Sequence, residues 1–238
     1  MNTFSVLRIW PLLRHLSTIL CCVVLLVSCY IPDQYECEIR LTKDGGYGIT
    51  FNGILTYAPL YGQIVRKKID PEHAKENEKM FLEQLKRDDG FKEVTSLGMG
   101  RYKVRFSREG RFAGSHQMVT FVTRQEPIFR ILTTESGNVE VNGSGQGKMY
   151  AKSLEEVGVK SAGLLRIVTD AQVTDQNAQF TRASPAPGFT QYDWRPRSLR
   201  DTPPRFVAKL AIDPRTGVPA YGGSGVNVEP EATPPPRP

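Results

Sequence analysis

Hydrophobic and polar positions alternate along most of this chain, after one long apolar run over residues 16–27. Two alternating segments, 36–43 and 48–57, flank Asp44-Gly45-Gly46, a combination typical of a tight β-hairpin. Short β-branched or aromatic segments follow at 91–96, 101–107, 117–123, 128–134, 139–141, 164–169, 172–180, 192–195 and 205–210. The pattern predicts a body built mainly from antiparallel strands.

Helical periodicity is clear in one place, from residue 71 to about residue 87. Asp70 can cap this helix, Pro71 fits its first turn, and Glu72 favours the positive end of the helix dipole. Its apolar side is narrow, so it can cover a sheet but cannot form a central core. The predicted fold class is α+β, mainly antiparallel sheet with one principal covering helix.

Three further segments are harder to assign. We expect a third strand at 63–69, a flexible connection between strands at 142–148 and a short helical turn at 154–157. The strands 164–169 and 172–180 should meet at 169–171. Gly53, inside the second strand, predicts a bulge or a close approach of backbone.

The apolar run ends in Leu26-Val27-Ser28-Cys29, and no acidic residue precedes Asp33. This layout is typical of a secretory signal peptide, and its end resembles the lipobox of bacterial lipoproteins. The resemblance implies that Cys29 is acylated with palmitate and becomes the mature N-terminus. An ordinary cleaved signal would favour a small residue in place of Leu26. An uncleaved membrane helix needs about 20 apolar residues, more than this run has.

Domain organisation follows from this interpretation. Residues 1–28 are the signal peptide, 29–34 the lipidated N-terminus with a short tether, and 35–212 one α+β domain. The tether reaches less than about 20 Å, so the domain is held close to the membrane. Residues 213–238 are rich in proline and glycine and predict a disordered or polyproline-like tail.

Charge and cysteine content narrow the possible partners. The formal net charge is +6, and loss of the signal peptide with its two arginines leaves +4. An exported chain would not meet nucleic acid, so anionic lipid is the expected electrostatic partner. Cys21 and Cys22 leave with the signal, and Cys37 then has no partner for an internal disulfide. Its alternation with Ile39 predicts a buried, inert thiol.

The spacings that mark common catalytic and metal sites are absent. The sequence has no CxxC, HExxH or GxSxG, and the glycine-rich segment 142–148 lacks the spacing of a phosphate-binding loop. We therefore expect no catalytic residue, no metal and no cofactor. The alternative is a hydrolase or transferase whose site is assembled from distant residues, of which His116 and Asp170 are the candidates.

Residues 101–106 form the most suggestive charged segment. If this segment is a strand, Arg101, Lys103 and Arg105 lie on one face, opposite an apolar face. Such a row could contact anionic headgroups. The alternative, which the composition favours, is the solvated face of an ordinary amphipathic strand.

The body of the chain also resembles the LppM-like bacterial lipoproteins. The resemblance rests on a β-hairpin soon after the lipidated cysteine, on segment 165–173 with Asn177-Ala178, and on Tyr192-Asp193-Trp194. It implies a domain of sheet and helix that binds lipid-like ligands, and it transfers no catalytic residue. The C-terminal transmembrane segment that some of those proteins carry is missing here.

These patterns together predict a non-catalytic envelope lipoprotein that binds a lipid-like amphiphile or a protein partner at the membrane face. A structural or assembly role, in which the proline-rich tail docks on a partner, is the alternative. Tyr30 follows Cys29 where an Asp would favour the inner membrane. This resembles the sorting rule of two-membrane bacteria and implies the outer membrane, facing the periplasm, in such a host.

Overall fold

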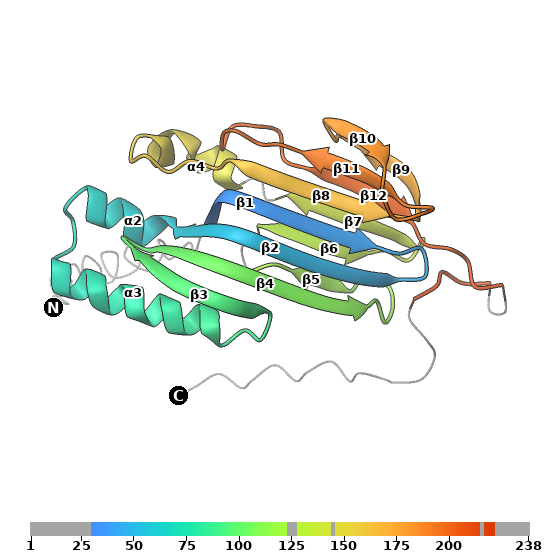
Figure 1. The fold of residues 1–238 in the computed structure, drawn as a ribbon, viewed down its shortest axis with the longest axis horizontal. Helices are drawn as coiled ribbons and strands as arrows, with labels where there is room; N and C mark the ends of the chain where they lie inside the picture. The colour runs from blue at the N-terminus through green and yellow to red at the C-terminus, as the bar shows by residue number, and fades with distance from the viewer. Residues whose placement is uncertain (1–29, 123–127, 144–145, 215–216, 222–238) are drawn as a thin grey trace, which may run out of the picture.

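The computed structural model describes residues 30–122, 128–143, 146–214 and 217–221. Cys29, the signal peptide and the tail beyond residue 221 lie outside the described residues. Two β-sheets and three helices make up the described chain (Figure 1). The predicted α+β class, with mostly antiparallel sheet and one main helix, is confirmed.

The larger sheet has seven strands in the order β10-β11-β8-β1-β2-β4-β3. These strands are β1 (Tyr30–Leu41), β2 (Gly46–Tyr57), β3 (Phe91–Gly98), β4 (Arg101–Arg111), β8 (Gly163–Thr169), β10 (Phe180–Ala183) and β11 (Thr190–Trp194). The β1–β2 hairpin lies at its centre. All pairs are antiparallel except β1 with β8, which run parallel.

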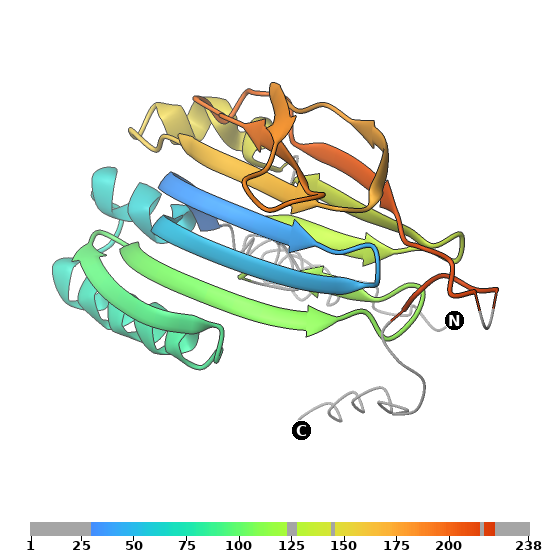
Figure 2. The ribbon, with the colours of Figure 1, turned by 45° about the vertical axis from the view of Figure 1, so that its right-hand side comes forward.

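The smaller sheet has five strands in the order β5-β6-β7-β12-β9. They are β5 (Met118–Thr120), β6 (Phe129–Thr133), β7 (Asn138–Gly143), β9 (Gln172–Gln176) and β12 (Arg205–Lys209). This sheet packs behind the larger one (Figures 1 and 2). Aromatic rings join the two layers: the Phe51 and Phe121 centroids are 4.6 Å apart, and those of Tyr192 and Phe206 are 5.2 Å apart.

Alternation along β4 decides which face enters this core. Tyr102, Val104 and Phe106 are buried, as the sequence pattern predicts. On the neighbouring strand, Phe51 lies directly opposite Phe106. The residues that alternate with the buried ones along β4, such as Lys103 and Arg105, point to the outer face of the larger sheet. One face of the strand is therefore apolar and the other polar.

The main helix, α3 (Pro71–Lys86), begins as predicted. The Asp70 carboxylate accepts hydrogen bonds from the backbone N–H groups of Glu72 and His73, each 3.1 Å long. Leu85 is buried, and the helix lies alongside β3 (Figure 1). The Tyr102 hydroxyl donates to the backbone oxygen of Glu78 at 3.1 Å, which fixes α3 to β4.

The strand expected at 63–69 is wrong. The chain forms α2 (Ala58–Val65) there, with a proline in its first turn. The helix buries Ala58 and Leu60 and ends at Val65 with Arg66 as its C-cap, and the following residue, Lys67, has a left-handed φ of 53°. The apolar residues that suggested a strand include Ile64, in the last turn of the helix, and Ile69, which follows it. Both pack on the core.

Two other local expectations also need correction. Helix α4 (Gln146–Glu155) begins inside the segment expected to be a flexible connection, and the predicted turn at 154–157 is the end of that helix. The strand expected at 172–180 ends at Gln176, β10 begins only at Phe180, and β8 and β9 belong to different sheets. Strand β8 pairs with β1 and β11, whereas β9 pairs with β12.

The close approach expected at Gly53 is confirmed. A Cβ at this position would lie 2.5 Å from the Cβ of Tyr35, so no larger residue fits without movement. The opposite strand is irregular at this point, with a register shift between Asp33 and Glu36. The glycine of β2 therefore lets the backbone of β1 come close at its bulge.

The chain still packs on the body beyond position 212, where the tail was expected to begin. Ile212 bridges Pro219, and Pro219 covers Gly137. The Tyr221 hydroxyl donates to the backbone oxygen of Thr134. Within the described ranges, none of the helices is long and apolar enough to cross a membrane.

Candidate functional site: a cavity between the two sheets

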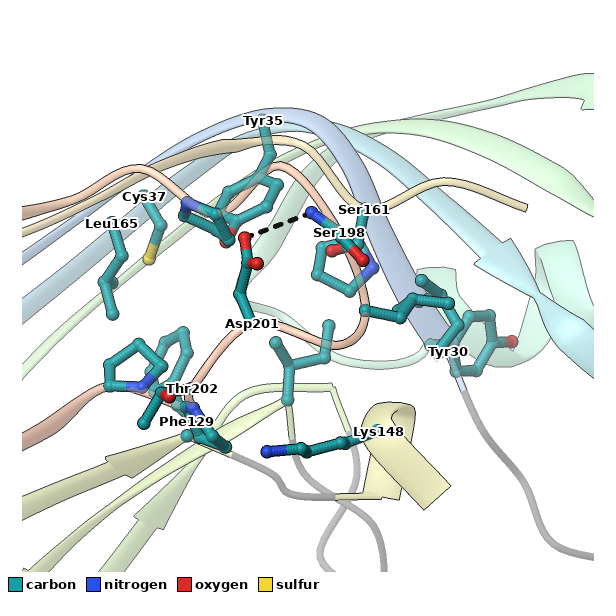
Figure 3. A pocket seen from close by; sticks show the side chains of 18 of the residues that line it. Tyr30, Tyr35, Cys37, Phe129, Lys148, Ser161, Leu165, Ser198, Asp201 and Thr202 are labelled. Atoms are coloured by element: carbon teal, nitrogen blue, oxygen red, sulfur yellow. Dashed lines mark hydrogen bonds between the residues drawn. The ribbon is translucent and has the colours of Figure 1, made fainter. Parts of the chain in front are cut away.

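A cavity of about 120 Å³ opens between the two sheets, at the end where β1 begins (Figure 3). Cys37, Phe51 and Leu165 line it from the larger sheet, and Phe129 lines it from the smaller one. Cys37 lies opposite Phe51 and also pairs with Leu165, so three neighbouring strands form one apolar wall.

A loop over residues 196–204 forms one rim of the cavity. The Asp201 carboxylate accepts hydrogen bonds from the backbone N–H groups of Arg197, at 2.7 Å, and Ser198, at 3.2 Å (Figure 3). Glu155, at the end of α4, accepts from the Ser198 hydroxyl at 3.1 Å and from Arg200 at 2.9 Å. These bonds fix the rim loop to α4, and the bond to Arg200 lowers the pKa of Glu155.

Polar side chains are the minority of the lining. Besides Asp201, whose oxygen bonds the loop backbone, they are Ser161, Ser198 and Thr202, with the exposed Lys148 at the mouth. No ion pair of Lys148 is present among the described residues. An apolar interior with a single cation at its mouth is suited to an amphiphile, with the apolar part inside and a polar head outside.

The thiol of Cys37 points into the cavity (Figure 3). It is buried, as predicted, and burial raises its pKa far above the usual range for a cysteine. The thiol is therefore neutral at ordinary pH, and a neutral thiol is a poor nucleophile. The arrangement makes Cys37 part of an apolar wall instead of a reactive centre.

Two tyrosines border the cavity from β1. Tyr35 stacks on Phe51 with 5.5 Å between ring centroids, and burial raises its pKa. Tyr30 packs on Tyr57 at 5.1 Å, and Figure 3 shows its hydroxyl directed away from the middle of the cavity. That hydroxyl is buried and is without a hydrogen-bond partner among the described residues.

The size of the cavity limits what can enter. An engineered apolar cavity of about 150 Å³ holds one benzene molecule. The space between these sheets is slightly smaller, so it admits a small apolar group or the terminal part of one acyl chain. A whole two-chain lipid would require the sheets to separate.

The predicted basic row lies elsewhere, on the outer face of the larger sheet. Arg101 is 3.9 Å from a carboxylate oxygen of Asp33, and Arg105 is 2.5 Å from one of Glu93. Lys103 is exposed and forms no ion pair within the part of the chain that is described. Acidic neighbours thus balance two of the three cations, and none of the three lines the cavity.

The residues considered for catalysis are not brought together. His116 faces Glu135, with 3.2 Å between Nε2 and Oε1, whereas Asp170 accepts from the backbone N–H of Lys43 at 2.7 Å. No hydrogen bond or ion pair joins His116 to Asp170 in the described chain. The same residues contain no group of three or more His, Cys, Asp or Glu side chains that could hold a metal ion.

The sequence analysis missed the cavity. Its walls come from β1, β2, β6 and β8, which are separated by up to about half the chain, and no local pattern marks such a site. The alternation along the first strand identified Cys37 as a core position. The packing of the two sheets and of the loop 196–204 at this end determines which core positions border the cavity.

Comparison with solved structures gives a likeness of fold. No protein-family model and no curated protein matches this chain. The NMR structure of the folded domain of Mycobacterium tuberculosis LppM is similar, with a TM-score of 0.37 and 11% sequence identity. The match covers 82% of this chain and 98% of that domain. It is the kind of protein that the sequence resembles.

Proposed function

We propose that this chain is a non-catalytic, lipid-anchored envelope lipoprotein that holds the apolar part of an amphiphile between its two sheets. One observation carries the proposal: Tyr30, at the edge of the cavity, directly follows Cys29 in the sequence. Adjacent Cα atoms are about 3.8 Å apart. An acyl anchor on Cys29 therefore brings the open end of the cavity to the bilayer.

The chemistry of the walls supports an amphiphile as the ligand. The interior is formed by aromatic and aliphatic side chains and a neutral thiol, and the cation of Lys148 stands at the mouth. A single-chain carboxylate or phosphate amphiphile fits this distribution, because its head can remain outside near the lysine. In a two-membrane host we place the protein on the outer membrane, facing the periplasm.

The anchor is tested by metabolic labelling with palmitate in bacteria that produce the full chain. We expect label on the wild type and none on a Cys29→Ala variant. Cys37→Ala is the matched control, because its buried thiol lies outside the signal, and it should label as strongly as the wild type. Equal label on Cys29→Ala would contradict the anchor.

Ligand binding is tested with a photoactivatable fatty acid in the same cells. We expect crosslinked peptides that contain cavity residues, and a loss of crosslinking in Leu165→Phe, which fills the space. Ile212→Phe adds an aromatic ring at an exposed position far from the cavity and serves as control. Crosslinking that is equal in both variants would exclude the cavity and would favour a role in binding a protein partner, through the tail.

A further inference from the structure

The end of the molecule beside the anchor carries a second unexplained surface. Figures 1 and 2 show the tip of the β3–β4 hairpin between α2 and α3. The tip is tied to this position, because the backbone N–H of Tyr57 donates to the Gly100 oxygen at 2.8 Å. A Cβ at Gly100 would lie 3.3 Å from the Leu60 side chain of α2. The hairpin tip and α2 therefore form one surface.

Apolar side chains of this surface face solvent. Leu97 is 49% exposed, Met99 42% and Val65 39%. Gly98, Met99 and Gly100 have φ angles of 80°, 57° and 70°, and nothing lies within 4 Å of a Cβ built on Gly98. The tip thus projects into open space, and its leucine and methionine add little to the core.

Three consecutive cations adjoin the apolar tip. Arg66, Lys67 and Lys68 follow Val65 and are all exposed. Arg66 donates a hydrogen bond to the backbone oxygen of Ser153 at 3.2 Å. In the described chain neither lysine forms an ion pair. The next acid along the sequence, Asp70, is occupied as the cap of α3 and by His73.

This surface lies close to the predicted anchor. Tyr30 is paired with Tyr57, the residue that precedes α2, and paired Cα atoms of antiparallel strands are about 5 Å apart. Adding one residue for Cys29, the anchor is on the order of 10 Å from the start of α2. Arg105, in contrast, lies about 13 Å further along β4 than Arg101.

We propose that residues 65–68 together with Leu97 and Met99, here called the end surface, dock on anionic phospholipid. The cations contact phosphate groups while Leu97 and Met99 enter the interfacial layer between headgroups and acyl chains. This orientation turns the cavity mouth toward the bilayer and leaves Lys103 and Arg105, further along β4, facing water, whereas Arg101 directly follows the hairpin tip. It rests on the proposed function only for the position of the anchor.

The expected size of the effect follows from the charges. One cation near an anionic membrane contributes about fivefold in partitioning, so three contribute on the order of 100-fold. Replacing Leu97 and Met99 with serine removes the apolar contribution and should weaken binding to neutral and anionic vesicles alike. These positions are exposed, so the variants should retain the unfolding temperature of the parent chain.

The test measures flotation with vesicles of phosphatidylcholine alone, or of phosphatidylcholine and phosphatidylglycerol at a ratio of three to one. The protein is the processed chain, residues 29–238, with Cys29→Ser so that no lipid contributes. We expect strong binding to the anionic vesicles and a loss on the order of 100-fold or more in the triple variant Arg66→Glu, Lys67→Glu, Lys68→Glu.

A control with the same charge change separates the end surface from general electrostatics. The triple variant Lys103→Glu, Arg105→Glu, Arg111→Glu alters net charge equally but further along β4, away from the hairpin tip, and we expect it to bind at least ten times better than the first triple variant. Equal losses in the two variants, or equal binding to both kinds of vesicle, would overturn the inference.

The end surface and the proposed function can fail separately, and the experiments distinguish the two failures. Palmitate on Cys29 and crosslinking in the cavity, with no vesicle binding by the unlipidated chain, would refute the end surface alone. Vesicle binding that depends on residues 65–68, with no palmitate on Cys29, would refute the anchor and support the end surface.

Discussion

Asp193 provides the sharpest test of how the outer face of the larger sheet is stabilised. Its side chain is 2% exposed. The carboxylate accepts hydrogen bonds from Arg166 Nε at 3.0 Å, from Arg182 at 3.2 Å and from the side-chain amide of Gln191, which is 3.0 Å from both oxygens. One buried acid thus satisfies donors from three strands, β8, β10 and β11.

Removing this carboxylate leaves its donors unpaired. Breaking a buried ion pair costs about 3–5 kcal/mol, because the remaining charge is buried without compensation. Arg182 is 58% exposed and can turn to water, so its share is small. Arg166 is 27% exposed and retains Glu38 at 3.8 Å, which reduces the penalty. We therefore expect Asp193→Ala to lower the free energy of unfolding by about 3 kcal/mol.

The assay is urea unfolding followed by tryptophan fluorescence, which Trp194 reports from the core. Asp193→Asn keeps the size but loses the charge, and should cost about 1–2 kcal/mol. The control is Asp175→Ala, which removes an ion pair with Arg205 in which the side chains are 41% and 56% exposed, and should cost less than about 1 kcal/mol. Equal losses for Asp193→Ala and Asp175→Ala would refute the reasoning.

Three further predictions concern single positions. Gly53→Ala forces a Cβ into the facing strand and should lower the free energy of unfolding, measured in urea, by about 1–3 kcal/mol. Gly114→Ala, where the added Cβ meets open space, should leave that free energy unchanged, and equal values for the two variants would contradict the close approach. Hydrogen bonding to Asp70 raises the pKa of His73 above its ordinary 6.5, so the pair should contribute stability that is lost as pH rises through that raised pKa. The pKa of His73, measured by NMR, should therefore fall in Asp70→Asn, and an unchanged pKa would be evidence against the pair. Burial of Cys37 should make its alkylation by iodoacetamide at pH 8 at least 100-fold slower than in urea, and comparable rates would mean that the wall is open.

Local chemistry was sufficient to predict part of this fold. The cap at Asp70, the proline after it and the periodicity of the following residues gave α3 within one residue of its observed ends. The alternation along β4 likewise gave the correct buried face. In both cases the deciding interactions lie within a few residues of one another, so the sequence contains them directly.

Other features depended on distant segments and were not predictable in this way. The apolar residues at 64 and 69 fit a strand as well as the exit of a helix, and only packing of α2 against the hairpin tip decides between them. Strands β8 and β9 are neighbours in sequence, yet each is recruited by a different sheet. The cavity is the product of both sheets and could not be read from either.

The parallel pairing of β1 with β8 has a consequence for how the protein is made. Tyr35 pairs with Gly163, so the central hairpin has one open edge until more than two thirds of the chain has been synthesised. Such long-range closure is slow. In the export that we propose for this chain, the delay is an advantage, because the first strands of a polypeptide that crosses a membrane unfolded cannot complete the sheet before its last third has followed.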